Sequence, residues 1–228
     1  MKKPNTIKIT KRILTEDEAD KTTALRRIVI KRDNDPLNPR EDYDNLFTIH
    51  SDCPRYLSSD NDAYDPIEDY GRCPDEAKPK DGVCAFPFYA YIHSGMALSM
   101  SSFADKWDSG CAGFIYVEKD KFCKEMGLKR FSRAKAYKIA KGEIETLNQY
   151  VNNEVFGFVE QTRESPEDEW EDGESCWGFF GEDSIPDMLA EAGADEEGTV
   201  ICEDMEAYYG KREVTMEIAK RSNGIEVA

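Results

Sequence analysis

The pattern of apolar residues along the chain predicts a series of short strands. The segment ALRRIVIKRD (24–33) has a β-branched apolar centre, which is typical of a strand. The segment CAGFIYVEKD (111–120) is the strongest strand prediction of the sequence. The other expected strands are 46–50, 86–93, 95–101, 154–162 and 174–181, of which the last two are expected to form a hairpin.

Helical spacing of apolar residues predicts one long helix at 132–153. Ser132 is suited to be its N-cap, and an apolar stripe with spacings of 3, 4, 3 and 4 residues runs along it. The stripe consists of Tyr137, Ala140, Ile144, Leu147 and Val151. A short helix is expected at 184–193, with Ser184 as N-cap, an early Pro and a terminal Gly.

Together these elements predict an α+β fold. We expect a mainly antiparallel sheet with one long helix packed on it and short helices near the C-terminus. The 228 residues are enough for one large domain or two small ones. We expect a single domain at 24–206, an N-terminal extension at 1–23 and a C-terminal helical segment at 207–228. A polar stretch at 51–82, which contains four Pro, is expected to be a long loop.

Charge is distributed unevenly along the chain. The net charge is −17, and the segment 160–206 holds eighteen acidic residues and one basic residue. Such a surface repels nucleic acids and anionic membranes, and it attracts basic surfaces, including protein grooves that normally hold nucleic acid. No apolar run approaches the ~20 residues of a membrane span, and no apolar region follows the basic first residues. The seven Cys are typical of reduced thiols, so we expect a cytoplasmic protein.

The most acidic segment, ESPEDEWEDGESCWGFFGEDSIPDM (164–188), also contains two Trp and two Phe. Alternation along CWGFFG (176–181) predicts a strand with one face on the core. The acids would flank that strand in the turns at both ends, where water screens their repulsion. The aromatic residues would then anchor a structure that presents carboxylates.

Two interpretations of this acidic segment remain open. It is either an ordinary solubilising surface or a mimic of nucleic acid, since B-DNA carries one charge per ~1.7 Å of its axis. In the second case, aromatic residues near the acids would supply the desolvated contacts that a tight complex needs. The candidate partner-binding residues are Glu167, Asp168, Glu169, Trp170, Glu171, Asp172, Glu174 and Trp177.

A cysteine-dependent enzyme is an alternative. Cys111 follows a turn-like WDSG segment, and His93 with Asp108 would complete the minimum set for nucleophilic catalysis. The simpler interpretation is that Cys111 is a small hydrophobic residue at the start of a buried strand. We therefore expect no catalytic residue.

Metal and cofactor sites are weakly indicated. His50 and Cys53 have H-x2-C spacing, and Cys73 and Cys84 follow in the polar stretch, which is a possible set of zinc ligands. No C-x2-C pair is present, so unpaired structural thiols are the favoured interpretation. The sequence contains no Gly-rich phosphate loop and no dinucleotide fingerprint, and we expect no cofactor.

The first half of the long helix is basic and offers a second type of surface. Its basic residues could contact nucleic acid directly, although a solvated helix face explains them as well. Pairing with the acidic segments is a further possibility. These residues are Arg133, Lys135, Lys138 and Lys141.

Five segments of the chain together resemble a family of small proteins carried by phages and mobile elements of gut and Gram-positive bacteria. They extend over about residues 28–190. They are NPREDYDNL (38–46), YIHSGMALS (91–99), KWDSGCAGFIYV (106–117), EIETLNQYVNNEVFGFV (143–159) and SCWGFFG (175–181).

This resemblance implies an anti-CRISPR protein that inhibits an RNA-guided type II nuclease in the cytoplasm of the host bacterium. It implies no catalytic motif. Combined with the acidic segment, it predicts a stoichiometric inhibitor that blocks the nucleic-acid channel of a host defence nuclease. A cysteine-dependent enzyme that modifies a host factor and a DNA-associated interaction module remain as alternatives.

Overall fold

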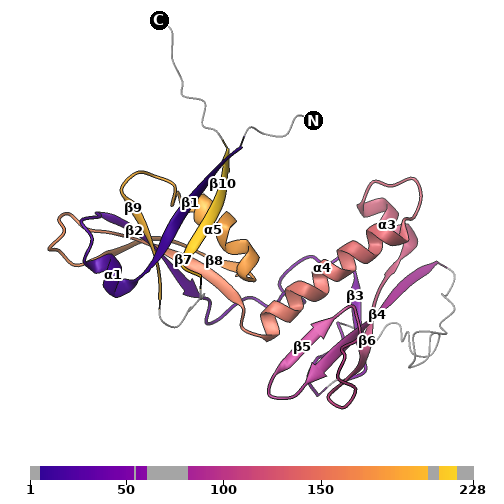
Figure 1. Cartoon of the computed structure of the whole chain (residues 1–228). Helices are drawn as coiled ribbons and strands as arrows, with labels where there is room; N and C mark the ends of the chain where they lie inside the picture. The colour runs from indigo at the N-terminus through magenta and orange to yellow at the C-terminus, as the bar shows by residue number, and fades with distance from the viewer. Residues whose placement is uncertain (1–5, 54, 61–81, 205–210, 220–228) are drawn as a thin grey trace, which may run out of the picture. The chain divides into compact units, whose positions relative to one another are not determined.

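The computed structural model describes residues 6–53, 55–60, 82–204 and 211–219 (Figure 1). The fold is α+β, as predicted, but the chain forms two compact units instead of one domain. Unit 1 comprises Met1–Pro36 and Asn153–Ala228, and unit 2 comprises Leu37–Asn152. Unit 2 is therefore an insertion between two segments that belong to the same unit.

A six-stranded mixed sheet forms the centre of unit 1. Its strands lie in the order β10-β1-β9-β2-β7-β8, where β9 pairs in parallel with β1 and β2 and the other pairings are antiparallel. β2 and β7 pair directly although unit 2 separates them in sequence. The strands are β1 (Thr6–Thr15), β2 (Arg26–Arg32), β7 (Val155–Thr162), β8 (Glu171–Phe180), β9 (Thr199–Glu203) and β10 (Glu213–Ala219).

Helices cover both faces of this sheet unequally. α5 (Ile185–Glu191) packs on one face, where Ile28, Phe156 and Met188 belong to one buried apolar cluster. The short α1 (Glu16–Asp20) covers part of the other face, where Ala19 packs with Val29 and Cys202. A 3₁₀ turn, Glu182–Ser184, leads into α5.

Both ends of the chain differ from the sequence-based expectation. The expected extension at 1–23 contains β1 and α1, because Ile9 and Ile13 alternate onto the core side while polar neighbours face out. The expected helical segment at 207–228 contains β10, in which Val214 and Met216 alternate inward in the same way. Neither strand is stable alone, and pairing of β1 with β10 stabilises both.

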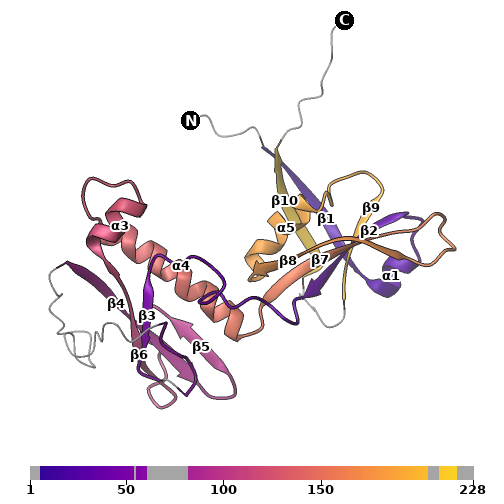
Figure 2. The ribbon, with the colours of Figure 1, turned by 180° about the vertical axis from the view of Figure 1, so that it is seen from behind.

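Unit 2 consists of an antiparallel four-stranded sheet and the long helix α4 (Arg133–Val151), which runs along the sheet (Figure 2). The strands lie in the order β3-β6-β4-β5. α3 (Lys119–Glu125) follows β6 directly. The strands are β3 (Thr48–Ser51), β4 (Val83–Ile92), β5 (Met96–Ser99) and β6 (Ser109–Glu118). Most of the expected loop at 51–82 lies outside the described residues.

The predicted helix and its stripe are largely confirmed in α4. Ser132 accepts a hydrogen bond from the Lys135 amide, as an N-cap does. The apolar stripe differs at its start, because Tyr137 is 38% exposed and contacts Phe86 from the edge. The buried residues of the helix are Ala136, Ala140, Ile144 and Leu147.

A buried ion cluster ties the segment before β3 to α4. The guanidinium of Arg40 contacts Asp60 at 2.5 Å and Glu143 at 2.8 Å, and all three side chains are largely buried. Burial raises the pKa of Glu143 against the opposing effect of Arg40. Glu143 also accepts hydrogen bonds from the amides of Leu46 and Phe47, so it fixes the entry into β3.

Candidate functional site

The acidic segment forms a β-hairpin at one edge of the sheet of unit 1. β7 and β8 pair as the sequence predicts, and β8 is an edge strand. The expectation that all the acids lie in turns is wrong, because β8 begins at Glu171 and three acids lie on the strand itself. The six predicted carboxylates are all exposed: Glu167, Asp168 and Glu169 in the connecting loop and Glu171, Asp172 and Glu174 on β8.

Trp170 fixes the base of the hairpin loop. Two guanidinium groups lie over its ring, with the Cζ atom of Arg27 at 4.5 Å and that of Arg163 at 4.2 Å from the ring centroid. Its Nε1 donates a hydrogen bond of 3.0 Å to Asp20, which also pairs with Arg27 at 2.8 Å. The predicted role of Trp170 as a packing anchor fits these contacts, in which its ring binds groups of the same molecule.

Arg163, the basic residue of the segment 160–206, is a structural brace. It is buried, and its guanidinium donates to the backbone carbonyls of Thr22, Ala24 and Pro166. Arginine is suited to this position because its planar fork offers five donors. The loop is held further by Asp168, which accepts a hydrogen bond of 2.9 Å from the Ser165 amide. The carboxylates therefore project from a structured loop.

Trp177 lies flat on the backbone of β7. The strand partner of Trp177 is Gly157, and a Cβ atom built at Gly157 would be only 2.3 Å from Cε3 of the indole. A bulge at Gly178, whose φ is +86°, breaks the predicted alternation. Phe179 consequently packs on the core side, while Trp177 stays 43% exposed on the opposite face.

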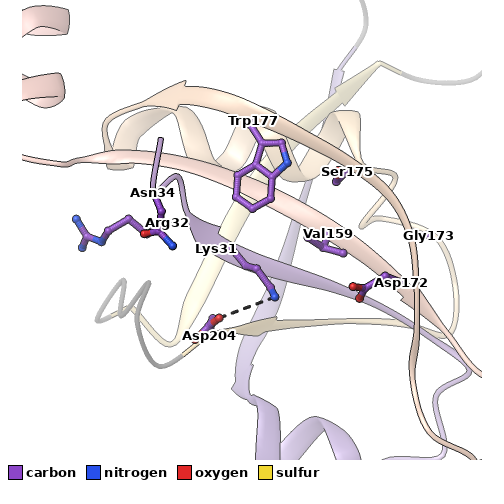
Figure 3. Close-up of a pocket in the computed structure, with 9 residues that line it drawn as sticks. All are labelled: Lys31, Arg32, Asn34, Val159, Asp172, Gly173, Ser175, Trp177 and Asp204. Atoms are coloured by element: carbon purple, nitrogen blue, oxygen red, sulfur yellow. Dashed lines mark ion pairs between the residues drawn. The ribbon is translucent and has the colours of Figure 1, made fainter. Parts of the chain in front are cut away.

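A cavity of about 520 Å³ adjoins Trp177 on the sheet face opposite α5 (Figure 3). Lys31 points toward Asp204, and the ammonium and carboxylate are 4.0 Å apart. Asp172 lies at the far end, where it accepts a hydrogen bond from Gln161. The lining residues are Lys31, Arg32, Asn34, Val159, Asp172, Gly173, Ser175, Trp177 and Asp204.

The three residues of the alternative catalytic set, Cys111, His93 and Asp108, do not come together in one site. His93 and Asp108 pair at 3.1 Å, but Cys111 pairs with Tyr89 across the strands, four residues from His93. Four residues of strand span roughly 13 Å, which is far beyond the reach of proton transfer. The Cys111 thiol donates instead to the Gly113 carbonyl at 3.6 Å. The proposed nucleophile and base are therefore separated.

The alternative zinc set is also wrong for the residues that the structure describes. Cys84 belongs to the apolar cluster under α4, whereas His50 follows the buried Ile49 on β3 and points to the opposite face of the sheet. Cys53 contacts Ser51 and the Ala112 carbonyl, and Cys73 lies outside the described residues. Within the described ranges, no three His, Cys, Asp or Glu residues could hold a metal ion together.

Two of the thiols are too deeply buried to react as nucleophiles. Burial raises the pKa of Cys202 to about 12 and raises that of Cys84 above its ordinary value. Both therefore remain protonated at neutral pH. Their positions in the two apolar clusters fit the predicted interpretation as structural thiols.

The basic face of α4 is partly taken up by internal contacts. The guanidinium of Arg133 lies 4.5 Å from the ring centroid of Phe86 and donates to Cys84. Lys141 pairs with Glu145 at 2.9 Å, one turn along the helix. Lys135 and Lys138 are exposed. Two lysines are a weak basis for nucleic-acid binding, for which a whole stripe of positive charge is typical.

Comparison of the chain with models of protein families, with curated proteins and with solved structures found no match. No helix in the described part of the chain is both long enough and apolar enough for a membrane span.

Sequence reasoning missed the residues that hold the hairpin in place. Arg27 and Asp20 contact Trp170 across more than 140 positions of sequence, so no local pattern could indicate them. Gly157 was part of an ordinary strand prediction. Its one local signal is a Gly inside an apolar strand, which often marks close approach by another group.

Proposed function

We propose that this protein inhibits a host defence nuclease by stoichiometric binding, and that its acidic hairpin occupies the basic nucleic-acid channel of the target. The target we propose is an RNA-guided type II CRISPR nuclease, whose guide–target duplex lies in a positively charged channel. The observation that supports this proposal best is the exposure of six carboxylates on a hairpin braced by Trp170 and Arg163.

The charge density of β8 is similar to that of a nucleic-acid strand. Residues 171–174 span roughly 10 Å of extended chain and carry three exposed carboxylates, Glu171, Asp172 and Glu174. One strand of B-DNA carries one charge per ~3.4 Å. Successive side chains of a strand point to opposite faces, so a basic channel that encloses the edge of β8 would contact these carboxylates from both sides.

The bracing of the hairpin favours binding as well. A disordered acidic tail loses conformational entropy when it binds, whereas a pre-formed loop has already lost it on folding. Association between the acidic hairpin and a basic channel should be fast and should slow steeply as salt concentration rises. A surface that only keeps the protein in solution would need neither the contacts of Trp170 and Arg163 nor a fixed arrangement of carboxylates.

The test is an order-of-addition cleavage assay with a guide-loaded type II nuclease. The protein is added before or after the target DNA, across a range of molar ratios. We expect inhibition that saturates near equimolar protein and is weaker when DNA is already bound. No inhibition at any ratio would exclude this nuclease as the target.

Charge-reversal variants locate the surface. The triple substitution Glu171→Lys, Asp172→Lys and Glu174→Lys should reduce inhibition at least tenfold, since charge pairs across such interfaces contribute about 1.5 kcal/mol or more each. The matched control reverses three exposed acids near α5 in the same unit: Asp183, Asp187 and Glu191. Equal inhibition by both triple variants would reject the hairpin as the binding surface.

A further inference from the structure

The cavity beside Trp177 has two ends of different chemistry (Figure 3). At one end the exposed indole lies on Gly157, close to the Lys31–Asp204 pair. Asp172 is at the other end, opposite Gln161 on β7, which is roughly 13 Å along the strand from Gly157. Val159 and Ser175 form the floor between them. This length fits an extended peptide of about four residues.

The molecule itself shows how a tryptophan of this hairpin is used. The guanidinium groups of Arg27 and Arg163 both lie over the ring of Trp170, and Asp20 binds both the indole and Arg27. No cation lies over the ring of Trp177 among the described residues. Trp177 therefore offers an aromatic face of the same kind that is open to a group from another molecule.

The charged residues that line the cavity decide which chemical group can bind in it. The cation of Lys31 is directed to Asp204, and Arg32 donates to the Asn153 carbonyl and lies over Phe156. The rim formed by β8 is acidic through one charged residue, Asp172, at the end of the cavity. A phosphate would meet this acidic rim, whereas a guanidinium can stack on the indole and donate to carboxylates at once.

We propose that this cavity binds an arginine-bearing extended segment of the partner protein. One guanidinium stacks on Trp177 near Asp204, and the segment runs over Val159 so that a second basic side chain reaches Asp172. This inference rests on the proposed function, because it names the chemical group on the partner that the hairpin region recognises. It adds a concave, arginine-selective site to a surface that otherwise attracts any cation.

The test uses the full chain labelled with 5-fluorotryptophan and observed by ¹⁹F NMR. The three Trp resonances are assigned with the substitutions Trp107→Phe, Trp170→Phe and Trp177→Phe. The probes are acetylated and amidated tetra-arginine, the equivalent tetra-lysine, and tetrathymidylate. We expect tetra-arginine to shift the Trp177 resonance with saturation, and to leave the stacked Trp170 and the 96% exposed Trp107 nearly unchanged.

The relative affinities of the two peptides and of three variants then test whether the site prefers a guanidinium group. Tetra-lysine should bind about threefold or more weakly, since a lysine loses the planar stacking of a guanidinium. Asp172→Asn should weaken tetra-arginine binding about two- to fivefold, whereas Glu191→Gln, which removes one exposed charge from α5 on the opposite face, should not. Trp177→Leu is the second variant, and it should abolish saturable binding while the other two resonances remain at their positions.

Three results would overturn this site. They are a Trp177 shift with tetrathymidylate but not with tetra-arginine, equal shifts of all three resonances, and equal affinity for the two peptides. The NMR experiment contains no nuclease, so none of these results tests the proposed inhibition. That proposal is tested separately by the cleavage assay. Conversely, selective binding of tetra-arginine without any nuclease inhibition would support the site and reject the proposed target.

Discussion

The two tryptophans of the hairpin differ because of what lies beneath each ring. Trp170 has two guanidinium groups over its ring and a carboxylate at its Nε1, so its surface is used within the fold. Trp177 has the backbone of β7 beneath one face and solvent at the other. A glycine at position 157 is the condition for this arrangement, since every other residue would place a Cβ inside the indole.

The substitution Gly157→Ala should destabilise unit 1 by about 1–3 kcal/mol, because a new methyl group forces either Trp177 or the backbone of Cys176 to move. The control is Gly142→Ala in α4, where no atom lies within 4 Å of the new Cβ apart from the helix itself. That substitution should stabilise unit 2 by about 0.5–1 kcal/mol. Native-state hydrogen exchange measures both units separately, and unchanged protection in Gly157→Ala would contradict the close contact.

At the scale of elements, the hairpin depends on residues far away in sequence. Arg163 connects its loop to the segment between α1 and β2 through Thr22 and Ala24. This contact counteracts the mutual repulsion of the exposed carboxylates, which would otherwise favour a spread loop. Arg163 can therefore be substituted without changing any exposed carboxylate, and the effects of the two can be measured separately.

The substitution Arg163→Lys keeps the charge but removes the planar fork. It should destabilise the hairpin by about 2 kcal/mol or more, because buried carbonyls lose their donors. Inhibition of the nuclease should fall although no carboxylate has changed. Arg12→Lys is the control, because Arg12 forms an exposed pair with Glu18 whose contribution is small. Faster amide exchange confined to 163–175 would support this role, and full inhibition with an unprotected loop would contradict it.

The element predictions succeed where one local pattern dominates. α4 and β2 follow from their own periodicity, and the β7–β8 hairpin follows from two neighbouring apolar runs. β1 and β10 were missed because their inward residues are few and their stability comes from pairing with each other. The orientation of Trp177 was beyond prediction, since the bulge at Gly178 shifts the alternation by one residue. The acidic residues and Trp170 were evident from the sequence, but the residues that hold Trp170 and the loop, Arg27, Asp20 and Arg163, were not.

At the scale of the whole molecule, unit 2 replaces the turn of a hairpin. β2 ends at Arg32, which pairs with Phe156 of β7, and the amide of Asp33 donates to the Val155 carbonyl at 2.8 Å. The strands therefore approach each other at the place where the inserted unit begins and ends. Each unit also has its own apolar cluster. The charge changes from basic to acidic near residue 33, and the Asn-, Asp- and Pro-rich stretch 34–45 follows, but such a stretch also fits a loop within one domain, which is why one domain was expected.

Unit 1 should consequently fold without unit 2. We expect a variant in which a Gly joins Asp35 to Asn153 to keep the dispersed amide spectrum of a folded domain, since β2 and β7 are already paired and a short turn can connect them. Under the proposed function, this variant should retain most of the inhibition, because the hairpin and the cavity both belong to unit 1. Residues 37–152 expressed alone form the complementary control and should not inhibit. If the shortened chain folds but loses inhibition, unit 2 contributes a contact to the target, and the exposed Trp107 of its 100–108 loop would be the first side chain to substitute.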